Sequence, residues 1–121
     1  MAEAQLEAKV RLEGGVAIID LQGDITAFAK GALDAAYDQA EATQPKAVAL
    51  NFSQVQYINS TGIALIVSLL ARARKDQRMV ICFGLSDHYL EIFQITRLSD
   101  FVQLVPDEAA ALRAAQSEEN V

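Results

Sequence analysis

The chain of 121 residues has the length of one domain, and its 52% hydrophobic and 21% charged residues are typical of a folded globular protein, which excludes a disordered chain. Its formal net charge of −6 would repel a phosphate backbone, so we expect no nucleic-acid binding. The acidic N-terminus lacks the apolar stretch of a secretory signal, and the lone Cys82 excludes an internal disulfide. The apolar run 62–71 has only half of the ~20 residues that a membrane span requires. We therefore expect a cytoplasmic protein without membrane insertion.

The N-terminal part predicts a hairpin. Residues 5–12 alternate between apolar and polar side chains, as a half-buried strand does. Gly14 and Gly15 supply a turn, and the β-branched residues within 16–23 indicate a second strand that pairs with the first.

Helices and buried strands alternate through the rest of the chain. A helix is expected over residues 28–42, with Thr26 as its N-cap. Its apolar face consists of Phe28, Ala32, Ala36, Tyr37 and Ala40. The runs 47–52 and 79–84 are continuous and apolar, which is typical of strands in the middle of a parallel sheet, and a second helix begins between them after Asn59.

The C-terminal third predicts one more strand between two helices. Ser86 can cap a third helix, residues 101–105 form a last strand, and a terminal helix runs from Pro106 to about residue 115, before a frayed tail over 117–121. The order ββαβαβαβα predicts a single α/β domain over residues 1–116. Its sheet is mixed and mostly parallel, with an antiparallel N-terminal edge strand.

Patterns typical of enzymes are missing from the sequence. A catalyst would need Asp24, Cys82 and His88 to converge, and their spacing gives no reason to expect it. There is no phosphate-binding glycine loop and no set of metal ligands, so we expect no cofactor and no catalytic activity. Three carboxylates, Asp34, Asp38 and Glu41, share one face of the first helix, as a solvated stripe or as a surface for a basic partner.

Two adjacent hydroxyl residues, Ser60 and Thr61, open the second helix. The Ser60 hydroxyl can accept hydrogen bonds from the backbone of the first turn, and this capping role alone would explain one serine. It explains neither the second hydroxyl nor the helix that follows, which is apolar nearly all round over residues 62–71. In a domain of this size full burial of such a helix is difficult, so an apolar surface for another protein is expected.

At these residues the sequence resembles the bacterial anti-sigma-factor antagonists, which are single STAS domains. Their signature, Asp-Ser-[Ser/Thr]-Gly-[Leu/Ile] after a strand, is similar to VQYINSTGIALI at residues 55–66. The glycine turn of the family is similar to GDIT at 23–26, and its third helix, link and last strand resemble LSDHYLEIFQITRLSDFV at 85–102. The resemblance covers essentially the whole chain.

The resemblance implies a partner-switching cycle. In this family the dephosphorylated antagonist sequesters an anti-sigma factor, which is also a serine kinase; phosphorylation of the motif serine ends the complex, and a serine phosphatase resets it. Ser60 matches that serine, with Thr61 as the alternative phosphoacceptor. The resemblance also implies a monomer or weak dimer. The residues that it assigns to partner binding are Asp24, Thr26, Asn59, Ser60, Thr61, Gly62, Ile63 and Val67.

Two positions depart from the family pattern. Asn59 and Thr26 stand where the family has aspartates, and both changes remove a carboxylate that is expected near Ser60. Asn59 can still form an Asx-type turn and Thr26 can still cap a helix, so the architecture is expected to persist. The alternatives are a constitutive binder without phosphotransfer and a non-catalytic scaffold subunit of a stress-sensing or transporter-associated complex.

Overall fold

The computed structural model describes residues 5–119, with the side chains of residues 5–116. The strands are β1 (Glu7–Glu13), β2 (Val16–Ile25), β3 (Ala47–Ile58), β4 (Met79–Phe83) and β5 (Gln103–Val105). The helices are α1 (Lys30–Glu41), α2 (Ser60–Lys75), α3 (Asp87–Ile95) and α4 (Glu108–Glu119), with short 3₁₀ turns η1 (Ala27–Ala29) and η2 (Leu98–Asp100). Within the described part of the chain, none of the helices is long and apolar enough to cross a membrane.

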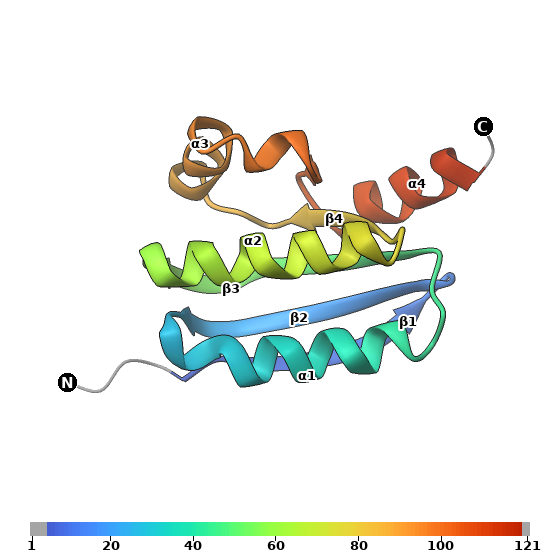
Figure 1. Ribbon diagram of the computed structural model, residues 1–121. Helices are drawn as coiled ribbons and strands as arrows, with labels where there is room; N and C mark the ends of the chain where they lie inside the picture. Colours follow the sequence, from blue (N-terminus) through green and yellow to red (C-terminus); the bar gives the residue numbers. More distant parts are fainter. Residues whose placement is uncertain (1–4, 120–121) are drawn as a thin grey trace.

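The five strands form one sheet in the order β1-β2-β3-β4-β5. Strands β1 and β2 pair antiparallel through a hairpin, whereas β2, β3, β4 and β5 are parallel neighbours. Each parallel step passes through one helix, and Figure 1 shows α1 and α2 lying side by side along the strands, with α4 beyond β4. The expected fold class, element order and antiparallel edge strand are confirmed.

Two apolar cores lie on opposite faces of the sheet, because successive side chains of each strand point to opposite sides. On one face Ile19, Leu50 and Cys82 pack with residues of α1, α2 and α3. On the other face Ile18 and Ala49 pack with α4. The strands therefore bury both faces, as their continuous apolar runs predict.

Strand β3 is longer than the sequence indicates. It was expected to end at residue 52, but it continues to Ile58 through residues that are largely polar and exposed. Pairing with β2 holds this extension, as Gln22 faces Gln54 and Ile25 faces Ile58 across two register shifts. The last strand is shorter than expected, since residues 98–100 form η2 and pairing begins only at Gln103.

The first helix also differs at its start. Phe28 was assigned to the apolar face of a helix beginning there, yet it lies in η1 with 79% of its surface exposed. The tighter 3₁₀ turn changes the direction of the side chain, and the regular helix begins only at Lys30. At the other end of the chain α4 continues to Glu119, past the expected boundary at residue 116, and residues 120–121 lie outside the described part.

The acidic stripe of the first helix makes ion pairs within the domain. Asp38 pairs with Arg72 of α2, and Glu41 accepts two hydrogen bonds from Arg78, of 2.7 and 2.9 Å. These contacts join the C-terminal ends of α1 and α2. Asp34 also pairs with Lys30 within α1, so all three carboxylates of the stripe are paired inside the domain. This counts against a merely solvated stripe and against a free acidic surface for a basic partner.

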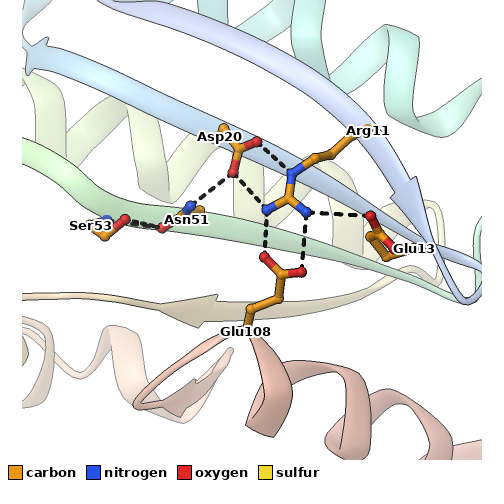
Figure 2. A network of polar contacts seen from close by, with 6 residues as sticks. All are labelled: Arg11, Glu13, Asp20, Asn51, Ser53 and Glu108. Atoms are coloured by element: carbon orange, nitrogen blue, oxygen red, sulfur yellow. Dashed lines mark hydrogen bonds and ion pairs between the residues drawn. The ribbon is translucent and has the colours of Figure 1, made fainter.

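A second ion-pair group fixes α4 to the sheet (Figure 2). Arg11 of β1 donates to Asp20 of β2 at 2.6 and 3.1 Å and also to both carboxylate oxygens of Glu108 at the start of α4. Asn51 of β3 donates to Asp20 at 2.8 Å. Hydrogen bonds from Arg11 lower the pKa of both Asp20 and Glu108.

Candidate functional site

The carboxyl ends of β2 and β3 meet at one edge of the sheet, where α2 begins. Ile25 and Ile58 are register partners, and the amide of Asn59 donates to the carbonyl of Ile25 at 3.2 Å. The turn η1 follows β2 at once and contacts α2. The structure therefore brings the glycine turn, with Asp24 and Thr26, to the start of the helix at Ser60, although these segments are more than thirty residues apart. Figure 1 shows this junction at the left end of α2.

Asn59, rather than Ser60, is the N-cap of α2. Its backbone is extended and its side-chain oxygen accepts a hydrogen bond of 2.8 Å from the amide of Gly62. The expectation that the Ser60 hydroxyl caps the helix is therefore wrong, because Ser60 already has a helical position as the first residue of α2. Within the described residues the exposed hydroxyl of Ser60 makes no hydrogen bond, so capping does not explain the serine.

Gly62 allows the first turn of α2 to approach the end of β2. A Cβ atom at this position would lie 1.9 Å from the carbonyl oxygen of Ile25 and 3.0 Å from the side chain of Ile58. No side chain larger than hydrogen fits against this backbone. The glycine of the motif thus has a packing role, and it fixes where Ser60 and Thr61 lie.

Thr26 is an N-cap, as expected, but it caps the 3₁₀ turn η1 and not the helix α1. Its side chain is buried, and its hydroxyl oxygen accepts a hydrogen bond of 3.3 Å from the amide of Phe28, which caps η1. Asp24 is half-buried at the end of β2 and is the register partner of Tyr57. Among the residues expected to bind the partner, Thr26 and Gly62 are thus buried, so they can shape the surface but hardly touch a partner.

The outer face of α2 continues from Ser60 as a row of small side chains. Ala64, Val67 and Ala71 follow Ser60 at helical spacing and are exposed, with Val67 at 45%. Ile63 is half-buried, whereas the bulky Ile66, Leu69 and Leu70 face the core. The expected apolar surface is present but narrow.

Phe28 extends this surface beyond α2. Its ring lies in η1, the turn that contacts α2, and it is the most exposed large apolar side chain among the described residues. Sequence reasoning missed it because helical spacing assigned it to the core. Its position two residues after the cap Thr26 was the signal, since the first residues after a cap often form a 3₁₀ turn.

Cys82, His88 and Asp24, which a catalyst would need to bring together, lie in different surroundings. Cys82 is fully buried in the middle of β4, and burial raises the pKa of its thiol far above the usual range. His88 is exposed on α3, where its ring meets that of Tyr89 edge-on. Asp24 lies at the sheet edge, and residues 5–119 hold no cluster of three or more potential metal ligands.

The fold and the site together define a small α/β domain with a mixed five-stranded sheet and an accessible hydroxyl at the start of a helix. The family model of the STAS domain matches residues 7–111, and the chain belongs to this family.

Individual relatives agree with this assignment. The anti-sigma-B factor antagonist of Listeria monocytogenes is 28% identical over 86 residues, which are 71% of this chain and 75% of the relative. The solved structure of an anti-sigma factor antagonist from Mycobacterium paratuberculosis has a TM-score of 0.79 at 21% identity, covering 92% of this chain and 94% of the other. A sulfate transporter family protein from Wolinella succinogenes has a TM-score of 0.77 at 19% identity, covering 92% and 93%.

Proposed function

We propose that the chain is an anti-sigma factor antagonist: when dephosphorylated it sequesters an anti-sigma factor with serine kinase activity, and phosphorylation of Ser60 releases that partner. The observation that carries the proposal is the exposed Ser60 hydroxyl at the first position of α2, next to an N-cap supplied by Asn59. The curated relative from Listeria supports the class of partner. A cytoplasmic location, a monomer or weak dimer in solution, and a phosphatase that resets the cycle belong to the same proposal.

A phosphate at Ser60 would be tolerated by the fold. It adds about 1.5 to 2 negative charges at the positive end of the α2 dipole. The amides of Gly62 and Ile63 already donate to Asn59, while those of Ser60 and Thr61 belong to the first turn, whose N–H groups have no partner inside a helix. These groups can stabilise an anion, as helix N-termini commonly do.

The same phosphate would oppose docking. Ser60 lies at one end of the exposed row that continues through Ala64 and Val67, and Phe28 lies close by on η1. A partner that covers this surface would remove water from the phosphate, which is costly for a dianion without a cationic partner. The domain would therefore keep its fold while it loses its affinity.

The test compares capture of the purified anti-sigma factor by variants of the whole chain. Ser60→Asp should weaken capture by about a hundredfold, which corresponds to roughly 3 kcal/mol of lost binding free energy, and should leave the unfolding midpoint near that of wild type. Gln39→Glu adds the same charge on the exposed side of α1 and is the matched control. Capture by Ser60→Asp equal to that by Gln39→Glu would overturn the proposal.

Phosphopeptide mapping after incubation with the kinase and ATP identifies the acceptor. Ser60→Ala should abolish the modification and preserve capture, whereas Thr61→Ala should keep both. Modification retained in Ser60→Ala and lost in Thr61→Ala would assign the phosphate to Thr61. Capture without any modification of the wild type would identify a constitutive binder.

A further inference from the structure

A groove runs between the C-terminal half of α2 and the segment that joins α3 to β5. It consists of two adjoining hollows of about 310 and 610 Å³, which share Leu70, Arg74 and Phe101. Both volumes fall within the ~300–1,000 Å³ range of small-molecule sites. The groove shares Val67 and Ala71 with the exposed row that begins at Ser60, but most of its lining lies beyond that row, in the last turns of α2 and in the segment that joins α3 to β5.

The two hollows differ in character. The smaller one is lined mainly by apolar side chains, namely Val67, Leu70, Ala71, Leu98 and Phe101. The larger one adds polar groups, among them Gln77, Asp100 and Gln103. An occupant of the whole groove would therefore place an apolar body in one part and a polar head in the other.

Arg74 stands where the two hollows meet. Its guanidinium lies 5.5 Å from the centre of the Phe101 ring, and it is exposed. Arg72, Arg78 and Arg97 all make ion pairs with carboxylates, Arg97 with Asp100 of the groove itself. Among the side chains that the structure describes, those of residues 5–116, no carboxylate pairs with Arg74, so its charge is available to an anion.

We propose that this groove, called here the α2–η2 groove, binds a small amphipathic carboxylate, with a medium-length alkyl chain or one aromatic ring in the apolar hollow and the carboxylate on Arg74. An anion fits because a guanidinium binds carboxylates through paired hydrogen bonds. The pair between Arg97 and Asp100 neutralises the one acidic side chain that the groove lining contains. A neutral ligand of the same length would leave Arg74 unused.

In the experiment the ¹⁵N-labelled full chain is titrated with sodium octanoate, and binding is monitored through the amide chemical shifts. Saturable shifts are expected within residues 67–74 and 96–103, with a dissociation constant no weaker than about 1 mM. Octan-1-ol has the same chain length and no charge, and it should bind about tenfold more weakly, as loss of one charge-assisted hydrogen bond predicts.

Two variants separate the groove from general surface effects. Arg74→Gln should weaken octanoate binding by about tenfold, whereas Arg113→Gln, an exposed arginine of α4 on the other face of the sheet, should leave it unchanged. The proposal is overturned if the shifts fail to saturate or fall outside the groove. Equal binding of octan-1-ol, or equal binding by Arg74→Gln, would overturn it as well.

Discussion

The close approach of α2 to β2 predicts that replacement of glycine by alanine lowers the stability of the fold at Gly62 but raises it at Gly31. In Gly62→Ala the new methyl group would lie 1.9 Å from the carbonyl oxygen of Ile25, about 1.5 Å inside ordinary contact, so the first turn of α2 must move away. Overpacking of this kind costs about 1–3 kcal/mol, and a weakened Asn59 cap adds about 1 kcal/mol. The better helix propensity of alanine returns about 1 kcal/mol. We expect a net loss of about 2 kcal/mol.

Gly31→Ala is the matched control, since a Cβ atom there meets nothing within 4 Å on the exposed side of α1. The better helix propensity of alanine is then the one effect that remains, so the free energy of unfolding should rise by about 0.5–1 kcal/mol. Urea unfolding followed by far-ultraviolet circular dichroism measures both variants, with unchanged m-values as the condition for comparison. If Gly62→Ala proved as stable as wild type, the proposed packing role of the glycine would be refuted.

Two further predictions concern the ion-pair group of Figure 2 and the exposed Phe28. Arg11 lowers the folded-state pKa of Asp20 and Glu108 below the ordinary values of 3.8 and 4.5, so these carboxylates add stability above those values that is lost as pH falls through the lowered pKa. Unfolding midpoints between about pH 5 and 2 should therefore fall less steeply in Arg11→Gln than in wild type, and equal slopes would contradict this. Phe28→Ala should change stability by less than about 0.5 kcal/mol yet weaken capture of the anti-sigma factor, while Phe101→Ala, also exposed, should not; equal capture by the two variants would remove Phe28 from the docking surface.

Local patterns were sufficient for the fold. The alternation in residues 5–12 and the glycine pair predicted the hairpin, and the continuous apolar runs predicted the central strands. These signals suffice because the polarity of each side chain indicates whether that position is buried, without knowledge of its distant partners. The extension of β3 to Ile58 gave no such signal. Its residues are largely polar, and they remain in the sheet because β2 offers a continuing ladder of partners, which is a long-range property.

The candidate site was predictable in its location but less so in its details. Asparagine and serine are both good N-caps, so local preference could not decide between Asn59 and Ser60. The decision comes from the end of β3, where the amide of Asn59 bonds to Ile25 and thereby holds Asn59 in extended backbone. Similarly, the sequence placed Asp38 and Glu41 on one helix face, while their arginine partners in and after α2 follow from the packing of two helices.

An amide at position 59 keeps the start of α2 free of one negative charge, and this has a measurable consequence. Aspartate is as good an N-cap as asparagine, so Asn59→Asp alone should change the free energy of unfolding by less than about 0.5 kcal/mol. Beside an anion at Ser60 the new carboxylate is repelled, and two unit charges 4 Å apart in water interact by about 1 kcal/mol. A double-mutant cycle of Asn59→Asp and Ser60→Asp should therefore give an unfavourable coupling of about 0.5–1 kcal/mol that shrinks at high salt. Additive effects would mean that the two side chains point apart, and Asn59 would then have no part in how the helix start accommodates a phosphate.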